Sequence, residues 1–303
     1  MADVTANWIA ADWGTSRLRV WAMGPEGVRA RATSDAGMAG LTRDGFEPAL
    51  LALVERWLAP GGATPVIACG MVGSRQGWAE APYAPVPCPP LAPDRLCPAA
   101  TADARLRVGI VAGLRQDRPA DVMRGEETQI AGYLAKAPGF DGVLCLPGTH
   151  TKWVRVSAGE VVGFQTLMTG ELFALLSQHS VLRHDTAGTG WDAGAFAEAA
   201  AAALARPERL AAALFAIRAE ALLGDPAPGQ ARARLSGALI GAELAAARAW
   251  WLGQKVVVIG AARLGGLYAT ALAAQGVVAP RESAETMTLA GLALARAGVA
   301  VRG

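Results

Sequence analysis

Hydrophobic and polar positions alternate in short runs over the first third of the chain, which predicts a β-rich beginning. The strands expected from this alternation lie at 7–13, 18–23, 28–33, 65–70 and 105–113. Apolar residues recur at helical spacing over 46–58 and again over 125–137. Residues 80–100 are rich in proline, so we expect neither a helix nor a central strand there.

The second half mixes the same short strands with longer helical patterns. Strands are expected at 143–147, 152–156, 161–165 and 255–260, with a short one near 277–279. Helices are expected at 170–182, 193–205, 208–223, 230–252, 265–275 and 284–297. The apolar stretch 256–278 begins with β-branched residues and turns on glycines, so it predicts a strand, turn and helix rather than a membrane span. The order of elements is that of an α/β protein.

One strand-turn-strand pattern occurs twice. IAADWGTSRLRVWAM (9–23) and LCLPGTHTKWVRV (144–156) share an apolar strand, a Gly-Thr turn, a small polar cluster, a basic residue and a second alternating strand. The two lie 134 residues apart, nearly half of the 303-residue chain. A chain of this length predicts two packed domains. We place them at 1–138 and 139–303, with the last helix as a candidate to pack back on the first domain.

The second turn admits three interpretations: a polar hairpin, a metal or nucleophile site built on His150, or a cradle for phosphate. His150 lies in no HxxH or HxxxH pair, and the chain has no GxSxG motif, which disfavours zinc and a serine hydrolase. Glycine lets backbone N–H groups approach an anion, hydroxyls add donors, and a basic residue neutralises charge. The phosphate candidates are therefore Gly14, Thr15, Ser16, Arg17, Gly148, Thr149, His150, Thr151 and Lys152.

Asp12 precedes the first turn, where a carboxylate would repel a phosphate. Its position makes sense if Mg²⁺ lies between the two, with several waters retained on the ion. Two phosphate turns facing each other across a cleft would form a clamp for a nucleotide.

Composition narrows the class of protein further. With 52% hydrophobic and 18% charged residues the chain is globular. The net charge is only +2 and no Lys/Arg run is present, which disfavours a nucleic-acid partner. The start MADVTANW has no secretory pattern, so a cytoplasmic protein is expected, with Cys69 and Cys145 buried and reduced.

Several motifs together resemble known proteins. DWGTSRLR and LPGTHTKWV resemble the two phosphate motifs of the sugar-kinase/actin/hexokinase superfamily, and VVVIGAARLGG its adenosine motif. GMVGSRQGW, APYAPVP, MRGEETQ, LPGTHTKWV and LMTGELFALL follow one another as in the 2-dehydro-3-deoxygalactonokinase family. The resemblance runs from about residue 7 to 298. It implies two similar ribonuclease-H-like domains, with mixed sheets flanked by helices and the active site in the interdomain cleft. The implied reaction moves the ATP γ-phosphate to the 6-hydroxyl of 2-dehydro-3-deoxygalactonate in galactonate degradation.

Phosphoryl transfer needs a carboxylate that takes or orients the proton of the nucleophile. The resemblance and the spacing point to Glu126 and Glu127, at the start of a helix, and both stay candidates. The apolar residues Ile130, Leu134 and Ala137 would place Glu126 along the buried edge of this helix. Acids in the first turn of a helix are also a common structural feature.

A sugar acid needs basic and hydroxyl donors. Gly73, Ser74 and Arg75 in a glycine-rich loop are candidates, as is Arg124, although Arg75 fits a solvated loop equally well. Thr169 and Glu171 are further candidates, with helix capping preferred for Thr169. For the adenosine, the candidates are Gly260, Ala261 and Leu264. The resemblance leads us to expect paired glycines where this chain has Gly260-Ala261.

Two other functions stay open. Residues 256–266 imitate a dinucleotide-binding turn with Glu282 about 20 residues on, as in an NAD(P)-dependent oxidoreductase, but the middle glycine is Ala262 and little chain follows. The fold class also includes non-catalytic ATP- or sugar-sensing modules. The presence of both Asp12 and Glu126 favours a catalytic protein over a non-catalytic module. A homodimer is a further possibility.

Overall fold

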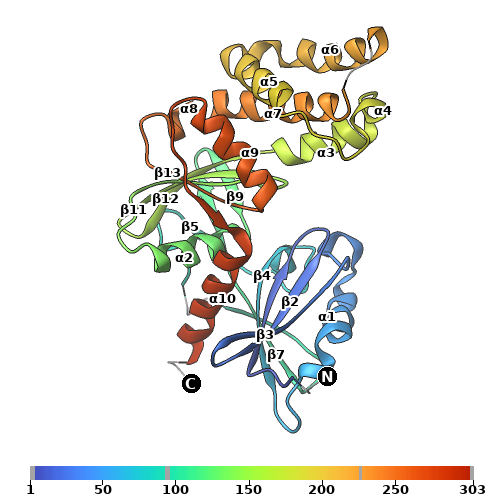
Figure 1. Cartoon of the computed structure of the whole chain (residues 1–303). Helices are drawn as coiled ribbons and strands as arrows, with labels where there is room; N and C mark the ends of the chain where they lie inside the picture. Colours follow the sequence, from blue (N-terminus) through green and yellow to red (C-terminus); the bar gives the residue numbers. More distant parts are fainter. Residues whose placement is uncertain (1–3, 93–95, 225–226, 301–303) are drawn as a thin grey trace. The chain divides into compact units, whose positions relative to one another are not determined.

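The computed structural model describes residues 4–92, 96–224 and 227–300, and the chain divides into two compact units. Unit 1 comprises Met1–Phe140, Ser157–Gly163 and Ala284–Gly303, and unit 2 comprises Asp141–Val156 and Phe164–Ser283. The last helix, red in Figure 1, therefore belongs to the unit that the N-terminus begins.

Unit 1 is built on a six-stranded mixed sheet with the strand order β3-β2-β1-β4-β7-β6 (Figure 1). The first three strands form an antiparallel meander, while β4 and β7 run parallel to β1. The strands are β1 (Trp8–Trp13), β2 (Leu18–Gly24), β3 (Gly27–Ser34), β4 (Thr64–Gly70), β6 (Cys97–Ala99) and β7 (Leu106–Ile110). The helices of unit 1 are α1 (Phe46–Val54), α2 (Glu126–Lys136) and α10 (Ala284–Ala300), with 3-10 turns η1 (Met38–Gly40), η2 (Arg43–Gly45), η3 (Glu55–Trp57) and η4 (Met71–Gly73).

The proline-rich segment contributes only edge strands, as the sequence predicts. β6 lies at one edge of the large sheet, and β5 (Tyr83–Pro85) at the edge of a three-stranded sheet in the order β5-β8-β9. An edge position suits proline because proline has no N–H to give to a neighbouring strand. The strands β8 (Gly113–Asp117) and β9 (Ala120–Met123) were not expected, because their short polar sequences carry little apolar alternation.

Unit 2 repeats the topology of unit 1. Its five-stranded sheet has the order β12-β11-β10-β13-β14. As in unit 1, the first strand (β10) pairs antiparallel with the next strand (β11) on one side and parallel with a later strand (β13) on the other, and β14 runs parallel to β13. The strands are β10 (Gly142–Leu146), β11 (Thr151–Ser157), β12 (Glu160–Leu167), β13 (Val256–Gly260) and β14 (Arg281–Ser283). The prediction of two similar halves with mixed sheets is confirmed. The short strand expected near 277–279 was wrong, because β14 pairs with β13 four residues later.

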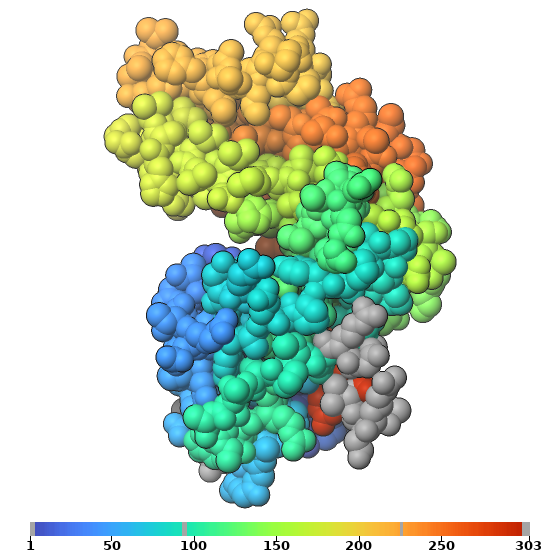
Figure 2. Space-filling model, turned by 180° about the vertical axis from the view of Figure 1, so that it is seen from behind, coloured from blue at the N-terminus to red at the C-terminus, as the bar shows by residue number. Residues whose placement is uncertain are grey.

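Helices occupy the long connection between β12 and β13. They are α3 (Thr169–His179), α4 (Arg183–Thr186), α5 (Ala193–Ala205), α6 (Leu210–Leu223), α7 (Gln230–Ala246) and α8 (Arg248–Trp251), with η6 (Pro207–Arg209) before α6 and α9 (Ala262–Ala273) after β13. Figure 1 shows α5, α6 and α7 packed beside one another at one end of unit 2, and their yellow and orange residues cover that end in Figure 2. Among the described residues, no helix has the length and apolar character needed to cross a membrane.

Two glycines let α2 and α10 approach closely. A Cβ on Gly132 would overlap the carbonyl oxygen of Met287, and one on Gly291 would overlap that of Thr128. Each helix follows the last parallel strand of its sheet, with β8 and β9 intervening before α2. The packing of α2, which carries two of the predicted acids, therefore depends on α10.

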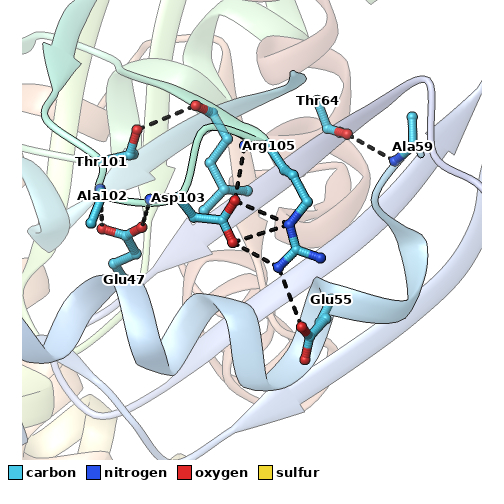
Figure 3. A network of polar contacts seen from close by, with 9 residues as sticks. Glu47, Glu55, Ala59, Thr64, Thr101, Ala102, Asp103 and Arg105 are labelled. Carbon is cyan, nitrogen blue, oxygen red and sulfur yellow. Dashed lines mark hydrogen bonds and ion pairs between the residues drawn. The ribbon is translucent and has the colours of Figure 1, made fainter. Parts of the chain in front are cut away.

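Polar contacts on the surface of unit 1 tie α1 to the turn that precedes β7 (Figure 3). The carboxylate of Glu47 accepts hydrogen bonds from the backbone N–H groups of Ala102 and Asp103, at 2.9 and 2.6 Å. The guanidinium of Arg105 bridges Asp103 and Glu55, at 2.7 and 3.3 Å. Exposed ion pairs contribute little, so the core of Trp13, Phe46, Trp78 and their neighbours dominates the stability of this unit.

Candidate functional site

The first predicted phosphate turn joins β1 to β2. The N–H of Gly14 donates to the carbonyl of Arg17 at 2.9 Å, which closes a four-residue turn. The side chains of Thr15, Ser16 and Arg17 in this turn are exposed. Two N–H groups of the 3-10 turn η1 hold this turn in place: those of Met38 and Ala39 donate to the carbonyls of Gly14 and Thr15, at 3.1 and 3.0 Å. The turn is thus held by η1 while its hydroxyls face solvent.

The second predicted turn joins β10 to β11 in the equivalent place, with Leu146 paired to Lys152 where the first turn has Trp13 paired to Leu18. Gly148 is half-buried, whereas Thr149 and His150 are exposed. Thr151 and Lys152 begin β11 and are buried, with exposed fractions of 0% and 4%. The exposed part of the turn therefore carries a hydroxyl and an imidazole, whereas the phosphate candidate Lys152 is buried.

The start of α3 is attached to the second turn. A Cβ on Gly170 would overlap the carbonyl of Gly148, so only glycine allows this approach. The N–H of Glu171 donates to the carbonyl of Thr149 at 2.9 Å, and the Nε2 of His150 lies 2.5 Å from the Glu171 carboxylate. The structure thus brings together His150 and Glu171, which the sequence had assigned to different ligands.

Thr169 does not cap α3, and the preference for a capping role was wrong. The helix begins at Thr169 itself, after Met168, and no side chain caps it. The Thr169 side chain instead hydrogen-bonds the buried Glu243 of α7. Burial of this kind was invisible in the sequence, because the two residues are far apart along the chain.

A cavity of about 400 Å³ opens beside the second turn, within unit 2. Its walls come from the turn and from α3, α7 and α9, and they include Gly148, Thr149, Thr169, Gly170, Phe173, Trp191, Arg232, Ser236, Ala261, Arg263, Leu264 and Tyr268. Two arginines stack on aromatic rings at its wall: Arg263 lies 5.2 Å from the ring centre of Trp191, and Arg232 lies 5.1 Å from that of Phe173. The size and the mix of apolar and polar walls suit a small organic ligand.

Ala261 occupies an ordinary backbone conformation. Its φ and ψ are −64° and 145°, which any L-residue adopts, and it serves as the N-cap position of α9. A Cβ on Gly260 would make only an ordinary contact with Pro147. The absence of a second glycine at this turn therefore costs no backbone strain.

The predicted acids of unit 1 gather where β1 and β4 end. Asp12 pairs in register with Cys69, and Trp13 with Gly70, whose φ is 90°. Gly125, with φ of 108°, packs against Gly70 at the start of α2. Both glycines adopt backbone conformations that disfavour a side chain, and together they bring the α2 N-terminus to the sheet edge that carries Asp12.

Within this cluster it is Glu127 that is buried. Glu127 has no exposed surface, and its carboxylate accepts hydrogen bonds from the N–H of Gly125 at 2.7 Å and the hydroxyl of Thr128 at 3.0 Å. Burial and the nearby Glu126 raise the pKa of Glu127 to about 8. Glu126 is half-buried and accepts from the N–H of Arg124 at 3.1 Å. The expectation that Glu126 rather than Glu127 lies on the buried side was wrong, because α10 packs against Thr128 and Gly132 of this helix and not against the side formed by Glu126, Ile130 and Leu134.

Asp12 is 8% exposed, and three charged neighbours act on its carboxyl group. Burial raises its pKa, the guanidinium of Arg19 at 2.6 Å lowers it, and Glu126 and Glu285 raise it again. Glu285, at the start of α10, is an addition that the sequence did not suggest. Arg17 lies in the exposed turn and contacts Asp35 at 3.4 Å.

Two candidate donors lie inside the protein: Ser74, in the glycine-rich loop after β4, and Arg124, which directly follows β9. Ser74 is 5% exposed, and Arg124, at 9%, lies with its guanidinium carbon 4.1 Å from the ring centre of Tyr83. Its Nη2 donates to the carbonyl of Ala81 at 2.8 Å. Among the described residues, neither Arg124 Nη1 nor Ser74 Oγ has a hydrogen-bond partner. Gly73 makes room for this guanidinium, because a Cβ there would approach Nη1 to 2.8 Å.

Arg75 points elsewhere. Its side chain is 82% exposed and lies 3.4 Å from Glu80. The structure therefore groups Ser74 with Arg124 and separates Arg75 from them.

A family model described as 2-keto-3-deoxy-galactonokinase matches residues 12–295 of the chain. The chain belongs to this family. A Rhizobium meliloti (strain 1021) protein named as a 2-dehydro-3-deoxygalactonokinase is 41% identical over 303 residues, covering 96% of this chain and 97% of that one. The 2-dehydro-3-deoxygalactonokinase of Escherichia coli (strain K12) is 34% identical over 296 residues, covering 95% and 97%.

A crystal structure shows the same architecture. It is that of a Sinorhizobium meliloti protein described as a 2-dehydro-3-deoxygalactonokinase, with a TM-score of 0.85, 40% identity and 96% of each chain covered. The predicted family and the predicted actin/hexokinase-type fold are both confirmed. The strand and helix at 256–266 thus belong to a sugar-kinase fold rather than to a dinucleotide-binding domain.

Proposed function

We propose that this chain is an ATP-dependent kinase that transfers the γ-phosphate to the 6-hydroxyl of 2-dehydro-3-deoxygalactonate, giving the 6-phosphate and ADP in galactonate catabolism. Membership of the family, whose relatives bear this name, supports the reaction. The single structural observation that carries the proposal is the conjunction of a cavity beside a phosphate turn in unit 2 with an acid cluster beside a second such turn in unit 1.

ATP would occupy the cavity of unit 2. The stacked pair of Arg263 and Trp191 offers a flat surface for adenine, and the turn at Gly148 and Thr149 offers N–H and hydroxyl donors for phosphate oxygens. His150 and Glu171 lie against each other beside this turn, so the imidazole is oriented by a carboxylate. An imidazole oriented in this way would donate its N–H to a phosphate oxygen.

Asp12 fits a role in holding Mg²⁺. The ion prefers carboxylate oxygen, phosphate oxygen and water. One oxygen of Asp12 accepts from Arg19, so we propose that the carboxylate orients a water on the ion. Among the described residues no group of three or more His, Cys, Asp or Glu side chains could hold a metal ion, and ATP oxygens would supply the remaining ligands. Bound Mg²⁺ would neutralise charge on the β- and γ-phosphates.

Glu126 is the proposed base. It is half-buried, and its carboxylate accepts a hydrogen bond from the backbone N–H of Arg124 at 3.1 Å. The 6-hydroxyl oxygen attacks the γ-phosphorus, its proton passes to Glu126, and ADP leaves. Glu127 is fully enclosed, so it would position Gly125 and the helix start rather than touch the hydroxyl.

The sugar acid would bind in unit 1. A guanidinium held on Tyr83 and Ala81 is ready to receive a carboxylate through its remaining nitrogen, and Ser74 would add a hydroxyl. We therefore propose sugar binding for unit 1 and nucleotide binding for unit 2. The cytoplasm, which supplies ATP, is the proposed compartment, and the homodimer stays a prediction.

The test is ADP release, measured with a coupled assay across a panel of sugar acids, with the product identified by mass spectrometry. We expect turnover with 2-dehydro-3-deoxygalactonate and phosphorylation at carbon 6. The gluconate-type epimer is the matched control for the stereochemistry. No turnover with any 2-keto-3-deoxy acid, together with tight NAD binding, would overturn the proposal in favour of an oxidoreductase.

A further inference from the structure

A carboxylate lies buried behind the cavity of unit 2. Glu243 of α7 is 3% exposed, and two strong donors reach its two oxygens. The indole N–H of Trp153 donates to Oε1 at 2.9 Å, and the hydroxyl of Tyr268 donates to Oε2 at 2.8 Å. These donors come from β11 and α9, so one side chain joins three elements.

Two threonines complete the network. The side chains of Thr151 and Thr169 both hydrogen-bond Glu243. The hydroxyl of Thr151 also lies 2.9 Å from that of Tyr268, and this closes a ring of hydrogen bonds. Every member of the ring is buried.

Placing a carboxylate here carries a cost. Burial raises the pKa of Glu243, and the hydrogen bonds from Thr169, Trp153, Tyr268 and Thr151 lower it. A buried charge is tolerated only where donors satisfy it, and an apolar residue of similar volume is often at least as stabilising. Stability alone therefore gives little reason for a glutamate at this position.

The partners of Glu243 share another property, which is their relation to the cavity. Thr169 and Tyr268 line it, and Thr151 directly follows the exposed part of the second phosphate turn. Glu243 itself does not line the cavity. It therefore does not touch a ligand there, but it hydrogen-bonds two residues that line the cavity, Thr169 and Tyr268, and also Thr151, which directly follows the exposed part of the turn.

We propose that Glu243 is a positioning residue for the nucleotide. It holds the end of the 148–151 turn, the first residue of α3 and Tyr268 of α9 in one arrangement, and so fixes the spacing between the phosphate and adenosine parts of the cavity. This inference rests on the proposed function in that it takes the ligand of the cavity to be a nucleotide.

The inference predicts a selective loss of nucleotide affinity. In Glu243→Leu, the hydroxyls of Thr151, Thr169 and Tyr268 lose their common acceptor. The turn, the start of α3 and α9 are then no longer held in one arrangement. Supporting residues behind metal sites contribute about 10–100-fold, and we expect a similar loss here. The dissociation constant of ADP, measured by calorimetry, and the KM for ATP should both rise at least about tenfold. The dissociation constant of the sugar acid, which binds unit 1, should stay within about twofold.

Glu243→Gln is the conservative variant. Its amide oxygen can still accept from Trp153 and its NH₂ can donate to Tyr268, but it offers the threonines one acceptor fewer. We expect it to restore most of the nucleotide affinity that Glu243→Leu loses. Tyr268→Phe removes the central hydroxyl of the ring, so its effect should be strongly non-additive with Glu243→Gln.

Leu244→Ala is the matched control. Leu244 is the next residue of α7, 1% exposed in the core, and contributes no atom to the network. It should lower the thermal midpoint while leaving ADP binding within about twofold.

Wild-type-like ADP binding in Glu243→Leu, with a lowered thermal midpoint, would overturn the inference and leave Glu243 a stabilising residue only. If Glu243→Leu fails to fold, Glu243→Gln and Tyr268→Phe decide, and additive effects in that pair would overturn it equally. A wild-type protein that binds neither ADP nor ATP would instead overturn the proposed function.

Discussion

The carbonyl of Gly148 lies where a side chain on Gly170 would have to be. This contact joins the second phosphate turn to the first turn of α3, and the hydrogen bond from the N–H of Glu171 to the carbonyl of Thr149 reinforces it. The glycine of the TGEL segment is therefore required by packing, not by its own backbone conformation.

Gly170→Ala should consequently damage nucleotide binding. The added methyl group must push α3 away from the turn, and overpacking of this kind costs about 1–3 kcal/mol. We expect a lower thermal midpoint and a KM for ATP that rises about tenfold or more, measured by steady-state kinetics. Gly62→Ala is the control, because a Cβ there meets nothing within 4 Å. Equal behaviour of the two variants would contradict this packing role.

Glu126→Gln should remove the base. We expect kcat to fall about 10²-fold or more, because an amide cannot accept the proton, while the ATP dissociation constant stays nearly unchanged. Glu127→Gln is the matched variant one residue on, and should lower kcat less. A larger fall in kcat for Glu127→Gln would exchange the two roles.

The stability of the protein should fall as pH rises from about 4.5 to about 8. The pKa of Glu127 is raised in the folded protein from 4.5 to about 8, so the folded state holds a proton that the unfolded state has released in this window. Each unit of difference is worth about 1.4 kcal/mol. Burial also raises the pKa of Asp12 and of Glu243, so these groups contribute with the same sign.

Glu127→Gln isolates the contribution of Glu127. Glutamine resembles the protonated acid and does not titrate, so the thermal midpoint of this variant should fall less between pH 5 and pH 8 than that of the wild type. Parallel pH profiles for the two proteins would show that Glu127 is not the titrating group.

Ala261→Gly should bring no gain in nucleotide affinity. Alanine already adopts the extended conformation required at the N-cap of α9, so a glycine would relieve no strain. We expect a KM for ATP within about twofold of the wild type and a slightly lower thermal midpoint, because glycine gives the unfolded chain more freedom. A clear gain in affinity would mean that the methyl group obstructs the ligand.

Arg124→Lys should weaken sugar-acid binding. An ammonium cannot reproduce the planar guanidinium that stacks on Tyr83 and donates to Ala81. We expect the KM for the acid to rise about tenfold or more while the KM for ATP changes little. Arg75→Lys, at an exposed position, is the control. Equal effects on both substrates would point to a general loss of structure in unit 1.

The strand-turn-strand repeat was predictable because its signals are local: apolar alternation on both sides of a glycine turn. The ring around Glu243 was not, because its members come from β11, α3, α7 and α9, and nothing near Glu243 in the sequence distinguishes it from an exposed helical acid. The prediction of which side of α2 is buried was wrong for another reason. Its contact face centres on Gly132, and a glycine adds nothing to an apolar pattern even where it is the residue that a neighbouring helix touches.

The pairing of α2 with α10 also sets an order of events during synthesis. The ribosome makes α2 before unit 2, and it makes α10 only after Ser283, the last residue of unit 2. Domains tend to fold as units as the chain emerges, beginning from the N-terminus. Here unit 1 cannot be completed before unit 2 has been made, since the helix that carries Glu126 and Glu127 lacks its glycine-matched partner until α10 has followed.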